Sequence, residues 1–220
     1  MSTGPKQALF AEFAGVARAL GHPHRLELLE HVAQGERGVE ALAERVGLSV
    51  ANASHHLKQL RRAGLVQARR EGKFVLYRLA DDSALALLTA LRAVAERNLE
   101  EVDRIVRGYF DDRDGMEPVS RQMLLDRLNA GLVTVLDVRP EDEYRQGHLP
   151  GAVNIPLAEL EARLAELPPE QEIVAYCRSA WCVLSFEAVA ALRKRGYSVR
   201  RLEDGYPEWK AAGLRVAANS

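Results

Sequence analysis

The sequence has no long apolar run and no recognisable targeting segment. No stretch approaches the ~18 uninterrupted apolar residues that a membrane-spanning helix needs, so we expect no transmembrane helix and no membrane partner. The N-terminus lacks the basic and then apolar segments of a secretory signal peptide. The 220 residues are 47% hydrophobic and 28% charged, which is ordinary for a globular protein of one large or two small domains. We therefore expect a cytoplasmic protein.

Cysteine is scarce, since only Cys177 and Cys182 are present, in one short segment. In a reducing cytoplasm such a pair is not expected to form a permanent structural disulfide. Two close cysteines are more often catalytic, redox-active or metal-binding in that compartment.

A strong net charge is also absent, because the formal net charge is −1. Local charge is different: between Lys58 and Arg78 there are seven basic residues and one acidic residue, Glu71. A neutral protein with such a basic stripe can hold a phosphate backbone, although a solvated helix face has the same composition. The stripe therefore indicates DNA binding only if the same residues also form a DNA-binding fold.

Hydrophobic spacing predicts a helical N-terminal half that ends in a β-hairpin. We expect helices over residues 39–46 and from the N-cap residue Ser49 to Gly64. A tight turn at Glu71–Gly72 predicts a hairpin over residues 66–79.

Residues 82–110 form one long helical pattern with an apolar stripe. A helix of that length spans roughly 40 Å at ~1.5 Å per residue, which is more than a small domain covers. We expect the stripe to pack against a second copy of the chain, so the pattern predicts a homodimer. Docking within one chain is the alternative.

The segment 111–118 is charged and contains glycine and proline, so it predicts an interdomain linker. Beyond it, apolar segments at 133–138, 173–176 and 197–202 alternate with helical ones. Strands separated by helices predict a parallel sheet and an α/β domain.

The order of helix, turn, helix and hairpin between residues 39 and 79 is that of a winged helix-turn-helix. This segment contains the motifs ALAERVGLS (41–49), ASHHLKQLRRAGLV (53–66), RREGK (69–73) and YRL (77–79). On these motifs the segment resembles the ArsR/SmtB family of small dimeric repressors, over nearly all of residues 10–110. It implies a dimeric repressor that binds double-stranded operator DNA.

In such a fold the second helix enters the major groove, where short polar side chains reach base edges or phosphates. The candidates in its N-terminal half are Ser49, Asn52, Ser54, His55 and His56. Basic residues expected at the phosphate backbone are Lys58, Arg61 and Arg62 on the helix, and Arg69, Arg70 and Lys73 on the wing. Phosphate contacts give an affinity that falls steeply with salt.

Many members of that family sense metals, but their usual ligands are missing here. At the thiol site the sequence reads Gly-Val-Glu-Ala (38–41), and residues 82–110 contain no histidine. His22, His24 and His31 remain, without a cysteine or a suitably spaced carboxylate. We expect no metal and no other cofactor.

The C-terminal half contains three ordered motifs, LDVRPEDEYRQGHLPGAVNIP (136–156), VAYCRSAWCV (174–183) and GYPEWKAAGL (205–214). On these motifs residues 119–216 resemble the rhodanese domain. The resemblance implies a sulfur-carrying Cys177 between a strand and a helix. Amides of the following loop would surround its sulfur and favour a nucleophilic thiolate. The loop includes Arg178, Ser179, Ala180, Trp181, Cys182 and Val183.

The loop departs from the family pattern Cys-x-x-Gly-x-Arg, because Ala180 replaces the glycine and Cys182 replaces the arginine. Unless Arg178 compensates, no guanidinium grips an anionic donor such as thiosulfate. The departure argues against thiosulfate sulfurtransferase turnover and against arsenate-reductase or phosphatase activity.

Cys182 has two alternative roles. It either attacks a persulfide on Cys177 to close a disulfide or polysulfide bridge, or it packs in the first turn of the helix. Asp137 and Arg139 are expected to pair and brace the base of the loop. Trp181 is either a lid over the loop or a surface anchor.

The sequence thus predicts an α+β winged helix-turn-helix domain with a long dimerisation helix (1–110), a linker and an α/β rhodanese-like domain with a parallel sheet (119–220). We expect a homodimeric repressor in which Cys177, with Arg178 and Cys182, senses or carries sulfane sulfur or an oxidant from a small donor. The alternative is a sulfurtransferase or thiol reductase with an autoregulatory DNA-binding module.

Overall fold

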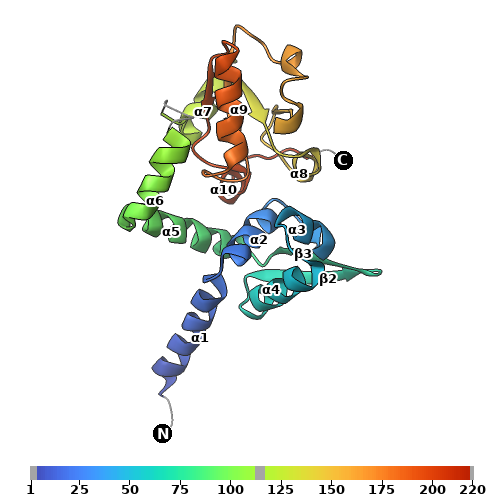
Figure 1. Ribbon diagram of the computed structural model, residues 1–220, viewed down its shortest axis with the longest axis vertical. Coiled ribbons are helices and arrows are strands. Elements are labelled where there is room, and N and C mark those ends of the chain that lie inside the picture. Colours follow the sequence, from blue (N-terminus) through green and yellow to red (C-terminus); the bar gives the residue numbers. More distant parts are fainter. Residues whose placement is uncertain (1–3, 112–116, 219–220) are drawn as a thin grey trace. The chain divides into compact units, whose positions relative to one another are not determined.

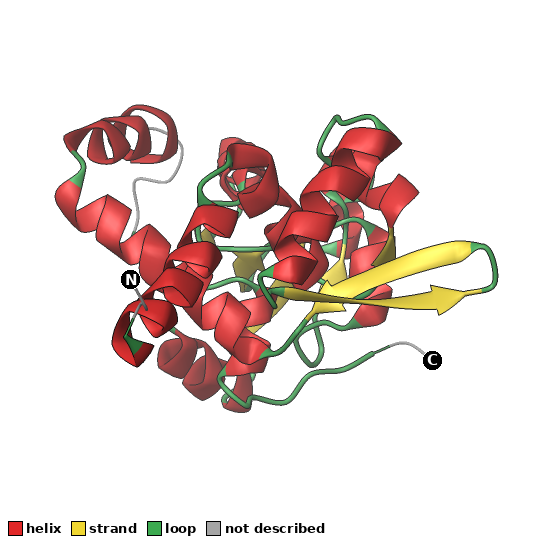
Figure 2. Cartoon of the chain, turned by 90° about the horizontal axis from the view of Figure 1, so that it is seen from below, coloured by secondary structure: helices red, strands yellow, loops and turns green. Residues whose placement is uncertain are grey.

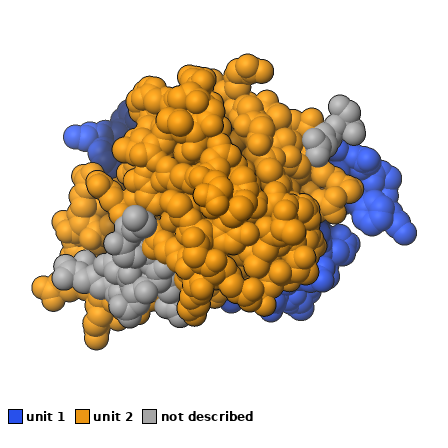
Figure 3. Space-filling view, turned by 90° about the horizontal axis from the view of Figure 1, so that it is seen from above, with its two compact units in different colours: residues 1–90 blue, residues 91–220 orange. Residues whose placement is uncertain are grey.

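The computed structural model describes residues 4–111 and 117–218, and it divides into two compact units, residues 1–90 and 91–220 (Figure 3). The boundary falls inside helix α5 (Asp82–Asn98), which begins in the first unit and ends in the second. Residues 112–116 of the expected linker lie outside the described residues. No described helix is long and apolar enough to cross a membrane.

The first unit combines helices with a three-stranded sheet (Figure 1). Its helices are α1 (Pro5–Leu20), α2 (Pro23–Ala33), α3 (Val39–Arg45), α4 (Val50–Arg62) and the start of α5, and its strands are β1 (Arg37–Gly38), β2 (Val66–Glu71) and β3 (Phe74–Leu79). One core joins leucines of α2, α3 and α4 to Tyr77 of β3 and Leu88 of α5. The predicted winged-helix order is confirmed.

Helix α4 is defined at both ends by its sequence. Ser49 is the N-cap, as predicted, and its hydroxyl accepts a hydrogen bond from the amide of Asn52 at 3.2 Å. Leu57 and Leu60 are fully buried. The chain leaves the helix at Gly64, whose φ of +73° is a left-handed conformation that favours glycine. The apolar face is therefore packed inward, and the polar face is left to solvent.

The β2–β3 hairpin forms the wing. It is antiparallel, with Glu71 opposite Phe74, so the two-residue turn is Gly72–Lys73, one residue later than predicted. Gly72 takes the positive φ, +59°, that this turn requires. Strand β1 pairs with the other edge of β3, and its two residues are too few to give a periodic signal in the sequence.

The single helix expected over residues 82–110 is broken. Helix α5 ends at Asn98, Leu99 is outside helical structure, and the chain continues as α6 (Glu100–Ile105) and a π-helical turn (Val106–Asp111). The side-chain amide of Asn98 donates to the carbonyl of Val94 at 2.8 Å, a local bond that competes with regular helix. Helix α6 leaves α5 at a bend (Figure 1), so the apolar stripe does not follow one straight face.

The second unit contains a parallel sheet in the order β5–β4–β6–β7, as the alternation of strands and helices predicts. The strands are β4 (Val133–Asp137), β5 (Val153–Asn154), β6 (Glu172–Tyr176) and β7 (Val199–Arg201). The helices are α7 (Arg121–Asn129), α8 (Glu141–Gln146), α9 (Val183–Lys194) and α10 (Tyr206–Ala211), with short 3-10 turns at Leu157–Glu159 and Leu164–Glu166. Figure 2 shows the helices of the chain in red and its strands in yellow.

Two cores lie on opposite faces of this sheet because alternate strand residues point to opposite sides. Ile173 and Ala175 of β6 pack in the core that contains the apolar residues of α9. Val174 and Tyr176 pack in the other core, with Trp209 of α10. Strand β6 is therefore packed on both faces, which holds its C-terminal end in place. The residue that follows this end, Cys177, begins the candidate site.

Candidate functional site

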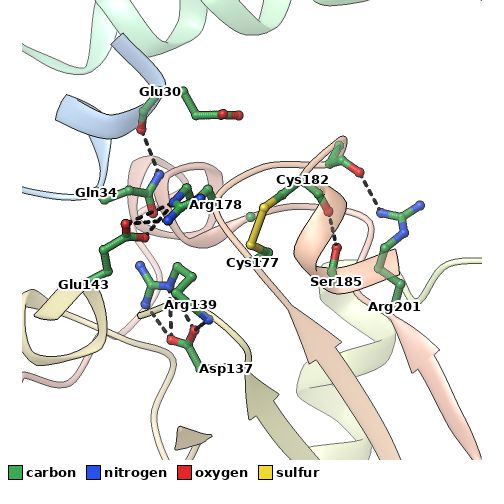
Figure 4. The surroundings of a disulfide bond; sticks show 12 residues. Glu30, Gln34, Asp137, Arg139, Glu143, Cys177, Arg178, Cys182, Ser185 and Arg201 are labelled. Atoms are coloured by element: carbon green, nitrogen blue, oxygen red, sulfur yellow. Dashed lines mark hydrogen bonds and ion pairs between the residues drawn. A yellow bond between two sulfur atoms is a disulfide. The ribbon is translucent and has the colours of Figure 1, made fainter. Parts of the chain in front are cut away.

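The loop between β6 and α9 holds both cysteines of the chain. Cys177 follows β6, Cys182 is the N-cap of α9, and their sulfurs form a disulfide with the Cα atoms 6.1 Å apart (Figure 4). This separation is normal for a disulfide. The nucleophilic thiolate expected at Cys177 is therefore absent from this bridged state, in which Cys177 is 1% exposed, Cys182 is 7% exposed, and both belong to the apolar core beside α9.

The N-terminus of α9 provides the electrostatic setting of Cys182. The first amides of a helix, here those of Val183 and Leu184, have no intrahelical carbonyl partner. The positive end of this twelve-residue helix therefore favours negative charge at the N-cap position. The amide of Cys182 donates to the carbonyl of Ser179 at 3.2 Å, so the loop itself forms a turn between the two sulfurs.

Arg178 is directed to a carboxylate. Its guanidinium donates three hydrogen bonds of 2.8 to 3.0 Å to Glu143 of α8, and Glu143 is completely buried. Figure 4 shows Arg178 pointing to Glu143. A charge neutralised in this way does not supply the anion grip that the missing loop arginine would give, because a bidentate pair satisfies the guanidinium.

The base of the loop is braced by the buried pair of Asp137 and Arg139. The pair predicted from the sequence forms, with 2.6 Å between Arg139 Nη2 and Asp137 Oδ2. Arg139 also donates to the carbonyl of Gly147 at 2.8 Å, and Asp137 accepts a hydrogen bond from the hydroxyl of Tyr176. Burial, and next the charge of Asp137, raise the pKa of Tyr176 well above its ordinary value. These residues hold the ends of β4 and β6 together.

Sequence reasoning missed two residues that contact the backbone of the cysteine loop. Gly205, the N-cap of α10, lies so close to the loop that a Cβ there would overlap the backbone of Arg178 and Ser179. Arg201 donates to the carbonyl of Ala180 at 3.1 Å and lies 4.3 Å over the ring of Phe186. The glycine was visible as the start of the GYPEWKAAGL motif, but no sequence signal links Arg201 to the loop.

Trp181 connects the cysteine loop to helix α5. Its ring lies parallel to that of Phe186 at 6.3 Å, and its indole N–H donates to Glu96. A second contact is the ion pair between Arg92 of α5 and Glu208 of α10, with 3.6 Å between Arg92 Nη1 and Glu208 Oε1. Both contacts lie within the second unit. Trp181 is thus an anchor to α5, and Glu96 is a partner that the sequence pattern did not reveal.

The predicted DNA-contacting residues form a mostly exposed surface on α4 and the wing. The exposed members are Ser49, Asn52, His55, Lys58, Arg61, Arg62, Arg69, Arg70 and Lys73, and the half-buried members are Ser54 and His56. Arg69 is held by Glu36, at 2.6 Å, and by Glu71, so carboxylates already compensate its charge.

His56 faces inward, toward the start of α2. Its ring centroid lies 4.5 Å from that of His22 and 6.0 Å from that of His24. Burial lowers the pKa of His56, and the neighbouring charges of His22, Arg25, His24 and His55 lower it further. The side chain therefore favours the neutral form and belongs to a packed histidine cluster. Within the described ranges, no group of three or more His, Cys, Asp or Glu side chains has the geometry to hold a metal ion.

Comparisons with known proteins agree with this architecture. A helix-turn-helix domain model matches residues 20–67, and a rhodanese-like domain model matches residues 120–212. The chain is 44% identical over 211 residues to the HTH-type transcriptional regulator Rv0324 of Mycobacterium tuberculosis (strain ATCC 25618 / H37Rv), covering 96% of this chain and 92% of the relative.

Two further relatives each match one half. A sulfurtransferase of Allochromatium vinosum is 34% identical over 87 residues, 39% of this chain and 79% of the relative. The homodimeric winged helix-turn-helix DNA-binding domain of a possible ArsR-family regulator from Mycobacterium bovis, solved in solution, is 40% identical, with a TM-score of 0.42, and covers 46% of this chain and 94% of that chain.

The near full-length match and the two domain matches confirm the predicted fusion of a winged helix-turn-helix regulator with a rhodanese-like domain. The chain belongs to a family of HTH-type transcriptional regulators that carry a rhodanese-like domain.

Proposed function

We propose that this regulator binds operator DNA as a homodimer, with an affinity set by the chemical state of Cys177 and Cys182. The observation that supports the proposal is the position of the pair. The only two cysteines of the chain are joined in a loop whose Trp181 hydrogen-bonds Glu96 of α5. A change at the sulfurs therefore has a physical route to the helix that leaves the DNA-binding unit.

DNA binding is assigned to the exposed face of α4 and to the wing. The polar side chains at the start of α4 (Ser49, Asn52 and His55) are exposed, and so are the basic side chains on its later turns. A helix of this kind reads base edges with its N-terminal residues while basic side chains bind phosphate. On the wing, Arg70 and Lys73 are exposed and Arg69 is already paired, so we assign phosphate contact to the first two.

Dimerisation is assigned to the apolar residues left exposed in residues 82–110, chiefly Leu87, Leu91 and Val94 on α5. Helix α1 also exposes Phe10 and Phe13. Large apolar side chains exposed on long helices are typical of an interface that a second chain covers. A C2 dimer would place two α4 helices on one duplex, as a palindromic operator requires.

The effector is a small donor of sulfane sulfur or an oxidant, acting at Cys177. Reduction of the disulfide frees the loop to relax, which moves Trp181 relative to Glu96. Helix α5 is continuous from Ala84 and Leu88, which are buried in the first core, to Glu96. Coupling of this kind requires the two sulfur states to favour different arrangements of the helix.

The experiment measures DNA affinity by fluorescence anisotropy for reduced, persulfidated and disulfide protein, in the wild type and in Cys177→Ser. We expect the wild-type affinity to change by about 5- to 150-fold between states, the usual range of allosteric coupling, and the variant to give one affinity throughout. Equal affinities in every wild-type state would end the proposal that sulfur chemistry controls DNA binding.

A second candidate is a sulfurtransferase with an autoregulatory DNA-binding module. It is favoured by the similarity of the C-terminal half to a sulfurtransferase and by the position of Cys177 between a strand and a helix. It is disfavoured by the engagement of Arg178 with Glu143 and by the bridge to Cys182. Sustained turnover with thiosulfate or a thiol persulfide, in which sulfur passes to an added acceptor, would favour this candidate over the sensor.

A further inference from the structure

We propose that the cysteine loop reduces sulfane sulfur to hydrosulfide, and that the Cys177–Cys182 disulfide is the product of that reaction. The inference rests on Cys177 being the sulfur acceptor of the proposed function. It goes beyond that function by assigning an activity to the loop and a nucleophilic role to Cys182. The loop would consume the sulfur it receives instead of passing it to another acceptor.

The reaction has two balanced steps. The thiolate of Cys177 attacks the outer sulfur of a thiol persulfide, which leaves a persulfide on Cys177 and releases the donor thiolate. The thiolate of Cys182 then attacks the inner sulfur of that persulfide, closes the disulfide and releases hydrosulfide. The two cysteine thiols lose two electrons, and the sulfane sulfur gains them. The donor persulfide is the only oxidant required.

Cys182 is placed for the second step. The two sulfurs are already bonding partners, with their Cα atoms 6.1 Å apart, so the attacking atom lies beside the inner sulfur. The turn closed between the Cys182 amide and the Ser179 carbonyl keeps the two residues together. An attack inside one loop has a large advantage over attack by a free acceptor, because the reactants are held in position.

The chemistry of the loop also favours this outcome. Cys182 is the N-cap of α9, where the helix dipole stabilises a thiolate and so increases its concentration near neutral pH. Cys182 stands where the family pattern has an arginine, and the neighbouring Arg178 is held by Glu143. The loop is therefore built with a second sulfur nucleophile in place of an anion-binding side chain.

Closure of the disulfide makes the reaction self-limiting. In the bridged state Cys177 is 1% exposed and has no free thiol, so it does not accept a second sulfur atom. One chain thus releases one hydrosulfide and stops, unless an added thiol reduces the bridge. With excess thiol the same loop would turn over, with the thiol as the electron donor.

The test uses the full-length reduced protein, freed of reductant and mixed with glutathione persulfide that carries a heavy isotope of sulfur in its outer position. Labelled sulfide is trapped by alkylation and measured by mass spectrometry, and the intact mass of the protein is recorded on the same sample. We expect about one labelled sulfide per chain and a protein lighter by two hydrogen atoms, the signature of the bridge.

Two cysteine variants and one surface control complete the design. Cys182→Ser should gain one sulfur atom on Cys177 and release no labelled sulfide, and Cys177→Ser should neither load nor release. Leu132→Ser, a change at an exposed position of the same unit outside the cysteine loop, should behave as the wild type. Equal sulfide release from Cys182→Ser and wild type, or a wild type that stays loaded as the persulfide, would overturn the inference.

DNA affinity measured on these samples separates the two proposals. If the wild type stays loaded as the persulfide and changes its DNA affinity without releasing sulfide, the regulatory function stands and the reductase activity fails. If the wild type releases sulfide and bridges with no change in affinity, the activity stands and the regulatory function fails. A protein that takes up no sulfur at Cys177 overturns the inference, and treatment with a disulfide-forming oxidant then tests the regulatory function alone.

Discussion

At the scale of single residues, His56 makes the stability of the winged-helix unit depend on pH. Burial, and then the charges of its neighbours, lower its pKa below the ordinary value of 6.5. The folded protein therefore binds fewer protons than the unfolded chain once the pH falls through 6.5. The contribution to stability is complete above that value and is lost as the pH falls toward the lowered pKa.

We therefore predict that the free energy of unfolding decreases as the pH falls below 6.5, and that His56→Gln flattens this dependence. Urea titrations followed by circular dichroism at each pH measure it. Ser54→Ala, on the same helix and without a titratable group, should keep the wild-type slope. If the free energy of unfolding of His56→Gln depends on pH as steeply as that of the wild type, this histidine is not the cause of the dependence.

Gly205 gives a second prediction at this scale. A methyl group there overlaps the backbone of Arg178 and Ser179, so Gly205→Ala should displace the cysteine loop and cost about 1–3 kcal/mol, the usual effect of overpacking. Thermal unfolding measures the loss, and the rate at which a thiol reductant opens the disulfide should rise. Gly108→Ala is the control, because open space surrounds that position. Equal melting temperatures for the two variants would contradict the close packing.

At the scale of elements, the contact of the cysteine loop with α5 should carry the coupling. Trp181→Phe keeps the ring beside Phe186 but removes the indole N–H that donates to Glu96. We predict that this variant forms the disulfide normally while its DNA affinity no longer differs between reduced and bridged protein. Anisotropy titrations of both states measure this, and Glu96→Gln should show the same loss. Full wild-type coupling in both variants would place the route elsewhere.

The wing gives a further prediction at the scale of elements. Lys73→Ala should weaken DNA binding and lower the slope of log affinity against log salt by about one, because one phosphate contact is lost. Arg69→Ala should change the slope less, since Glu36 and Glu71 already hold that guanidinium. Titrations at several salt concentrations compare the two variants. A larger slope change for Arg69→Ala than for Lys73→Ala would reverse the assignment.

The elements also show where sequence reasoning reaches and where it stops. The bounds of α4 follow from local chemistry at Ser49 and Gly64, and that helix was predicted closely. Strand β1 and the break at Leu99 were not, because two residues give no period and a single side-chain bond at Asn98 leaves the apolar pattern intact. The cysteine loop was located by its motif, but the disulfide was only one of two alternatives. Its partners Glu143, Glu96 and Arg201 come from distant segments that no local pattern connects to it.

At the scale of the whole molecule, the proposed dimer depends on the apolar residues exposed in residues 82–110. Val94 is 60% exposed on α5, so Val94→Glu would place a charge within the proposed interface and should produce a monomer with weak DNA binding. Light scattering after size-exclusion chromatography measures the mass. Leu132→Glu is the matched control, at 62% exposure on the rhodanese-like unit, and should remain dimeric. A dimeric Val94→Glu protein would move the interface away from α5.

The presence of a single possible disulfide in each chain has a consequence for how such a dimer responds to dose. Both cysteines of a chain are used in one bridge, so once the reaction is complete each subunit is either unbridged or bridged. A pair of subunits then has three forms, with no bridge, one bridge or two. The steepness of gene induction would depend on whether one closed subunit is enough to release a palindromic operator, and mixed dimers of wild-type and Cys177→Ser chains isolate that middle form.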